Sequence, residues 1–176
     1  MRIKFYQSWF ANFQMNKFLI IFICFFCSSV SQALEIKCNF EEVYKNGQIQ
    51  QGILIMKNDL LRYQYFNPGL FTIFHDGQKF FALENQNLEK FHILNNNTKM
   101  LNELVILAQK FPDIENSYKR NNYIINIEKS LVDKFVKRIS INSNNLNMSI
   151  FFHNCKFMPI NNRVFEFDPL LVKIEG

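Results

Sequence analysis

Glycine is scarce in this chain of 176 residues, with five in all, and this scarcity argues against functions that need glycine-rich loops. A phosphate-binding loop or a dinucleotide cradle needs closely spaced glycines, and no such cluster occurs in the sequence. The G-x-S-x-G motif of serine hydrolases is missing as well. These absences argue against nucleotide chemistry and against that class of hydrolase.

Histidine is also rare, and its spacing does not suggest a metal site. His75 borders the Asp76-Gly77 turn, where we expect it to face solvent, and neither His92 nor His153 has an acidic partner at ligand spacing. His153 and Cys155 would share a face of a strand, so a hydrolase with a Cys–His nucleophile is an alternative. We predict that the protein is not an enzyme and that it holds no metal and no cofactor.

No basic stripe interleaved with aromatic residues occurs, although the formal net charge is +5. Nucleic-acid binding is therefore not expected. The length suits one domain with one core, and we expect a monomer.

The first 33 residues have the pattern of a secretory signal peptide. Arg2, Lys4 and Lys17 precede an unbroken apolar run over 18–27, and small and polar residues follow to Ala33. The run is short for a membrane span. We predict cleavage after Ala33, with translation starting at Met1 or at Met15, and an uncleaved anchor is the alternative. Cleavage would lower the net charge to +2, because the leader carries three positive charges and no negative one.

Two of the four cysteines lie in the leader, which leaves Cys38 and Cys155. Two cysteines in an exported protein predict one disulfide, and two buried free thiols are the alternative. A bridge between them would close a loop of more than a hundred residues and contribute about 3–5 kcal/mol.

Alternating apolar residues and turn signals predict an antiparallel sheet. Asn46-Gly47, Asn58-Asp59, Asn67-Pro68-Gly69 and Asp76-Gly77 separate short β-prone stretches. The predicted strands are 36–44, 49–57, 60–66, 70–75, 79–83, 88–93, 123–128, 136–143, 147–153 and 164–167.

One helix interrupts the strands. Thr98 is a candidate N-cap, apolar residues at spacings of three and four run from Leu101 to Ala108, and Phe111-Pro112 ends the pattern. The fold class is therefore α+β, with nine or ten strands in one sheet and one or two helices inserted in the middle.

Strands 60–66 and 70–75 are partly apolar on both faces. Leu61, Tyr63 and Tyr65 share one face, whereas Leu60 and Phe66 lie on the other. A one-sided sheet would alternate more cleanly. One small helix cannot cover ten strands, so either a closed aromatic core or an apolar cavity with a movable helical lid is expected.

Three stretches of the sequence resemble the outer-membrane lipoprotein carrier (LolA) family. The Gly-led strand 52–57 is followed by Leu-Arg-Tyr-Gln-Tyr at 61–65 and then by Pro68. Residues 76–81 are similar to the family's Asp-Gly hairpin, and 164–169 to its closing Phe-x-Phe-x-Pro strand. The resemblance spans most of residues 52–174.

The resemblance implies a strongly curved antiparallel half-barrel closed by a lid helix and a role as a periplasmic carrier. Such a carrier takes the acyl chains of lipoproteins from an inner-membrane ABC transporter and delivers them to an outer-membrane receptor. A LolA-like paralogue that binds another lipid or senses lipoproteins is an alternative. Carried over by position, the cavity would be lined by Leu54, Met56, Leu61, Tyr63, Tyr65, Phe71, Ile73 and Phe80, and the inner face of the lid by Leu104 and Leu107.

Two departures from the family pattern change the expectation for the lid. The family's Arg-Pro pair, whose arginine binds the lid, is replaced by Asn58-Asp59, so we expect a lid that opens more easily. The chain also enters a strand almost directly after Ala33, without the family's first helix, and a Cys38–Cys155 bridge could compensate for that loss.

Overall fold

The computed structural model describes residues 34–87, 90–94, 98–120, 122–132, 134–144 and 146–166. The predicted signal peptide lies outside these residues. The chain divides into two compact units, Met1–Gln32 and Ala33–Gly176, and every described element belongs to the second. No helix in the described part is long and apolar enough to cross a membrane.

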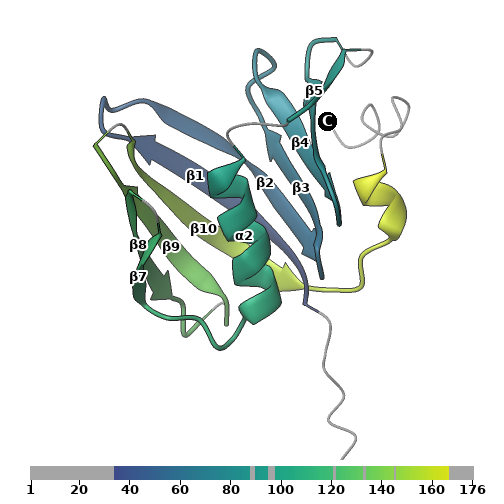
Figure 1. Ribbon diagram of the computed structural model, residues 1–176. Coiled ribbons are helices and arrows are strands. Elements are labelled where there is room, and N and C mark those ends of the chain that lie inside the picture. The colour runs from purple at the N-terminus through teal and green to yellow at the C-terminus, as the bar shows by residue number, and fades with distance from the viewer. Residues whose placement is uncertain are drawn as a thin grey trace, which may run out of the picture. The chain divides into compact units, whose positions relative to one another are not determined.

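Ten strands of the second unit form one open antiparallel sheet that curves around the one α-helix of the described residues (Figure 1). The order across the sheet is β6-β5-β4-β3-β2-β1-β10-β9-β8-β7. The elements are β1 (Glu35–Tyr44), β2 (Ile49–Lys57), β3 (Leu60–Tyr65), β4 (Phe71–Asp76), β5 (Phe80–Glu84), β6 (Phe91–Ile93), α2 (Lys99–Lys110), β7 (Ser117–Arg120), β8 (Tyr123–Lys129), β9 (Val136–Asn142), β10 (Asn147–Phe157) and the 3-10 helix η1 (Asn162–Phe165).

The predicted turns hold consecutive strands in hairpins. Gly47 and Gly77 have φ angles of 81° and 94°, the left-handed conformation that glycine adopts at little cost. The two halves of the sheet meet where β1 pairs with β10, and the predicted Cys38–Cys155 disulfide joins these two strands. The expected fold class, a curved antiparallel sheet with a short helix, is confirmed.

One strand was missed, and one predicted strand was wrong. β7 was not expected, because Ser-Tyr-Lys-Arg has no apolar alternation and its strand conformation depends on pairing with β8. The segment 164–167 was expected to be a strand, but Val164 and Phe165 belong to η1, whose N-cap Asn161 accepts a hydrogen bond from the Arg163 N–H. Phe167 lies outside the described residues.

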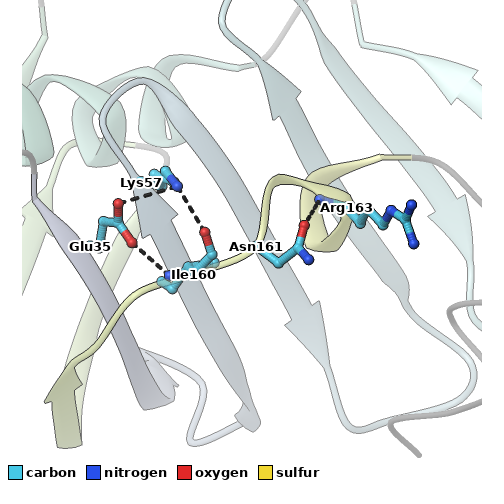
Figure 2. A network of polar contacts seen from close by, with 5 residues as sticks. All are labelled: Glu35, Lys57, Ile160, Asn161 and Arg163. Atoms are coloured by element: carbon cyan, nitrogen blue, oxygen red, sulfur yellow. Dashed lines mark hydrogen bonds and ion pairs between the residues drawn. The ribbon is translucent and has the colours of Figure 1, made fainter.

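The segment that leads into η1 packs on the outer face of the sheet, because it contacts Ile53 and Ile55, which alternate along β2 with the residues under α2. Ile160 and Phe165 are buried there against Ile55. Figure 2 shows how the polar ends of two strands hold this segment: the Ile160 N–H donates to Glu35 Oε2 at 2.6 Å, and Lys57 Nζ donates to the Ile160 carbonyl oxygen at 2.8 Å. The hydrogen bond from Ile160 and the nearby Lys57 lower the pKa of Glu35.

Candidate functional site: the helix-covered face

The inner face of the sheet, the face that α2 covers, carries a continuous apolar cluster. It arises from strand periodicity, because cross-strand partners point to the same face. Leu54 pairs with Tyr63 and Met56 with Leu61, while Tyr63 pairs on its other side with Ile73. On the other half of the sheet, buried residues of β8, β9 and β10 extend the same cluster, among them Ile125, Ile127, Ile139, Ile141, Met148 and Ile150.

Helix α2 packs on this cluster through one side. Leu101, Leu104, Val105 and Leu107 are buried, whereas Asn102 and Lys110 are exposed. The helix begins after Thr98 as expected, but the Thr98 side chain caps no backbone N–H and instead accepts a hydrogen bond from Asn102 Nδ2 at 3.2 Å. Pro112 follows the last turn, in keeping with the expected end of the helix.

Most of the residues expected to line a cavity lie together in this interface. Those buried in the cluster are Leu54, Met56, Leu61, Tyr63, Phe80, Leu104 and Leu107. Tyr65 and Ile73 are half-buried at its margin. Phe71 is 38% exposed and lies outside the cluster. The residues therefore form an interface between α2 and the sheet, and their contact with a ligand stays a prediction.

A buried carboxylate that sequence reasoning missed lies on the same face. Glu42 is fully buried, and three tyrosine hydroxyls donate to it. Tyr44 Oη lies 2.7 Å from Oε2, Tyr63 Oη lies 2.7 Å from Oε1, and Tyr65 Oη lies 3.1 and 3.2 Å from the two oxygens. No basic side chain in the described ranges forms an ion pair with Glu42.

The rings of this Glu42–tyrosine cluster are fixed by the packing around Gly52. Phe40 stacks on Tyr63 with ring centroids 3.9 Å apart, and Tyr65 meets both rings edge-on. A Cβ at position 52 would clash with the Phe40 ring and with the carbonyl oxygen of Gln64. Glycine at the start of the apolar part of β2 therefore makes room for the aromatic stack that orients Tyr63.

Burial governs the electrostatics of the cluster. Desolvation raises the pKa of Glu42 above its ordinary value, while the hydrogen bonds from Tyr44, Tyr63 and Tyr65 act in the opposite direction. Burial also raises the pKa of Tyr63, and the Glu42 charge adds to that effect.

The sequence contained a signal for the burial of Glu42. Every second residue of β1 points to the same face of the sheet, and these residues are Ile36, Cys38, Phe40, Glu42 and Tyr44. Glu42 is therefore the one acidic residue of β1 that shares a face with the apolar residues.

The cluster reaches the surface at Tyr44. This residue is half-buried and forms one wall of an open pocket of about 220 Å³ between the β1–β2 and β9–β10 turns. Amide and hydroxyl side chains dominate the rest of the pocket, which is lined by Lys45, Asn46, Ser143, Asn144, Leu146 and Asn147. The inner face is therefore apolar under α2 and polar at this end.

A second polar contact links α2 to the edge of the sheet. Glu103 of α2 is buried and accepts hydrogen bonds from Arg120 Nη1 at 2.7 Å and from Tyr118 Oη at 2.8 Å, both on β7. We call these three residues the α2–β7 latch. The latch is a side-chain attachment of α2 to the edge strand of the sheet.

The structure does not form the Cys–His nucleophile that the sequence left open as an alternative. Cys155 Sγ is bonded to Cys38 Sγ, so it is not free to act as a nucleophile beside His153. We expected His75 to face solvent, but this prediction is wrong. Its ring is buried against Phe80, and its Nδ1 lies 2.5 Å from the Asp59 carbonyl oxygen. Within the described ranges, no group of three His, Cys, Asp or Glu side chains could hold a metal ion.

Comparisons with known proteins give a distant structural likeness and no match in sequence. No protein-family model matches the sequence, and no curated protein matches it. Among solved structures, the fold is similar to that of a LolA superfamily protein from Nitrosomonas europaea, with 7% sequence identity over 78% of this chain and 91% of that chain and a TM-score of 0.48. A likeness at this level assigns neither a family nor a function.

Proposed function

We propose that the protein is a non-enzymatic carrier that holds the acyl chains of lipoproteins between α2 and the inner face of the sheet. One observation carries the proposal: the helix is the one described element that packs on this apolar face, and it does so through four aliphatic side chains. If α2 lifts, the side chains beneath it form a continuous apolar surface. The sequence motifs that resemble the LolA family add support.

The energetics suit an exchange of one apolar partner for another. An acyl chain gains about 0.8 kcal/mol for each methylene that it removes from water. Lifting α2 exposes Leu101, Leu104, Val105 and Leu107, and a bound chain would cover the surface that they leave. Because the helix competes for the same surface, the affinity for the chain is moderated, as a carrier that must release its cargo requires.

The proposed location is the periplasm. The leader pattern of residues 1–33 and the Cys38–Cys155 disulfide both suit export to an oxidising compartment. The proposed partners are an inner-membrane ABC transporter that releases lipoproteins and an outer-membrane receptor that accepts them, and the carrier acts as a monomer. None of these steps needs a catalytic residue.

The test is binding of a fluorescent apolar probe to the unit Ala33–Gly176, which contains every described element. We expect saturable binding near one probe per protein and displacement by a triacylated lipopeptide. Ile73→Glu places a charge at the margin of the inner cluster and should weaken binding at least tenfold. The matched control is Ile53→Glu, since Ile53 is also half-buried but packs on the outer face.

Three results would decide against the proposal or redirect it. Absence of binding by folded wild-type protein would contradict a carrier. Equal losses in Ile73→Glu and Ile53→Glu would show that binding does not occur on the inner face. Displacement by phospholipid but not by lipopeptide would assign the alternative, a carrier of another lipid.

A further inference from the structure

The β8–β9 turn projects two aliphatic side chains into solvent. Leu131 is 96% exposed and Val132 is 90% exposed, whereas the other large exposed apolar residues of the described chain lie between 38% and 56%. Scattered, partly covered apolar residues are ordinary on a protein surface. Leu131 and Val132 differ from that pattern, because they are neighbours at one turn and are almost wholly uncovered.

The base of this turn is anchored, so the exposure does not come from a detached loop. The Ser130 N–H donates to the Phe135 carbonyl oxygen at 2.7 Å. Phe135 is buried, and its ring packs against Phe111 and Phe152 with centroids 5.4 and 5.9 Å away. The core therefore holds Phe135 inward while the turn presents Leu131 and Val132 outward.

Two basic side chains lie next to the apolar tip of the turn, which consists of Leu131 and Val132. Lys129 and Lys134 flank it, and neither forms an ion pair with an acidic side chain that the structure describes. Glu128, at the end of β8, is paired with Lys137 at 2.9 Å and with Arg138 at 3.3 Å. Residues 129–134, which include Asp133, carry two positive charges and one negative charge, so the turn combines apolar side chains with a net charge of +1.

The tip also lies beside one end of the helix. Lys129 Nζ donates to the Pro112 carbonyl oxygen at 3.2 Å, and Pro112 follows the C-terminal end of α2 (Figure 1). A surface that contacts the β8–β9 turn is therefore close to the last turn of α2, where Lys110 is exposed.

We propose that the β8–β9 turn is a membrane-contact site. Leu131 and Val132 enter the boundary between headgroups and acyl chains, and Lys129 and Lys134 contact anionic phospholipid headgroups. Apolar side chains combined with lysines are the combination that binds the interface of an anionic bilayer, because apolar burial and electrostatic attraction add. The contact does not depend on the identity of the cargo, and it would bring the end of α2 to the bilayer surface.

Tryptophan fluorescence tests the insertion directly. Trp9 is the single tryptophan of the chain, so the unit Ala33–Gly176 contains none and Leu131→Trp introduces a unique reporter. With vesicles of 30% phosphatidylglycerol in phosphatidylcholine, we expect a blue shift and quenching by brominated acyl chains. Ile49→Trp is the matched control, because Ile49 is 53% exposed next to the β1–β2 turn, at the opposite end of the strands, and its emission should not change.

Vesicle sedimentation tests the two halves of the site separately. Leu131→Ser with Val132→Ser should lower binding to the anionic vesicles at least tenfold, and these exposed positions should leave the fold intact. Lys129→Gln with Lys134→Gln should weaken binding to anionic vesicles and reduce its dependence on salt. The proposal is overturned if Leu131→Trp shows no shift, if Ile49→Trp shifts equally, or if the Leu131→Trp shift appears without vesicles and follows protein concentration, which would assign a contact between copies of the chain.

Discussion

At the scale of single residues, Glu42 is a fully buried carboxyl group. A carboxylate moved out of water loses hydration worth several kcal/mol unless donors replace it. Tyr44, Tyr63 and Tyr65 supply hydroxyl donors, but no described basic side chain supplies a compensating charge. Folding therefore favours the protonated form of Glu42, and stability should depend on pH through this residue.

The first prediction concerns that dependence. The pKa of Glu42 is raised in the folded protein above its unfolded value of 4.5, so between those two values the folded protein binds more protons than the unfolded chain. The contribution of Glu42 to the free energy of unfolding is then full below pH 4.5 and is lost as the pH rises through the folded-state pKa. Glu42→Gln should remove this loss, so the variant should gain stability relative to wild type from pH 4.5 to 7.5 in urea denaturation.

The matched control is Glu41→Gln, since Glu41 lies on the outer face and accepts a hydrogen bond from Gln51. Its stability difference from wild type should change little over the same pH range. Parallel pH profiles for wild type and Glu42→Gln would contradict the assignment of a raised pKa to Glu42.

Sequence patterns located the apolar side chains of the interface better than its polar ones. Leu54, Leu61 and Tyr63 repeat with the period of a strand, and that period decides which face each side chain occupies. Phe71 follows the same period but begins β4 next to a turn, where little structure covers it. The contact from Tyr44 is local to β1, but the contacts from Tyr63 and Tyr65 depend on side chains of β1 and β3 meeting in space, which no local pattern encodes.

At the scale of elements, the α2–β7 latch adds a polar attachment to the apolar packing that holds the helix on the sheet. The Glu103 side chain is buried, whereas its partner Arg120 is half-exposed, so water screens one side of this ion pair. A hydrogen bond to a charged group contributes about 1.5–3 kcal/mol, and solvent at Arg120 reduces that value. The latch therefore adds a modest contribution to the apolar packing of α2, and under the proposed function its loss should let α2 lift more readily.

Loss of the latch should make α2 separate from the sheet more readily. Arg120→Met should raise the rate of amide hydrogen exchange in α2 about five- to thirtyfold, because it leaves Glu103 with one donor fewer. Amides of β1 and β2 should exchange as in wild type. Lys119→Met on the same strand is the control, since Lys119 is exposed and outside the latch. A uniform rise across α2, β1 and β2 would mean that the latch supports the whole fold and not the helix alone.

The elements that the sequence patterns assigned wrongly are those whose conformation depends on contacts with residues far away in the sequence. Val164-Phe165-Glu166 alternates like a strand, yet Val164 and Phe165 pack on the outer face as part of η1 beside Ile55. β7 shows the reverse case, because a polar segment becomes a strand when β8 offers a partner edge. The period of apolar residues cannot distinguish these outcomes without the tertiary partner.

At the scale of the whole domain, the β1–β10 pairing makes one sheet from the two halves of the chain. Consecutive hairpins could be predicted because turn residues separate neighbouring strands. The pairing of the first strand with the last could not, since such a partner leaves no local signal. Cys38 and Cys155 were the one long-range indication in the sequence, and their bridge lies at this junction.

At this same scale, acyl chains are proposed to occupy the interface between α2 and the inner face. The most direct test is photo-crosslinking of a triacylated lipopeptide, with a diazirine in an acyl chain, to the unit Ala33–Gly176, followed by mass-spectrometric mapping. The proposal predicts adducts on Leu104 and Leu107 of α2 and on Leu54, Leu61 or Tyr63 of the strands. Adducts confined to the outer face around Ile55 and Phe165, or none at a saturating lipopeptide concentration, would contradict it.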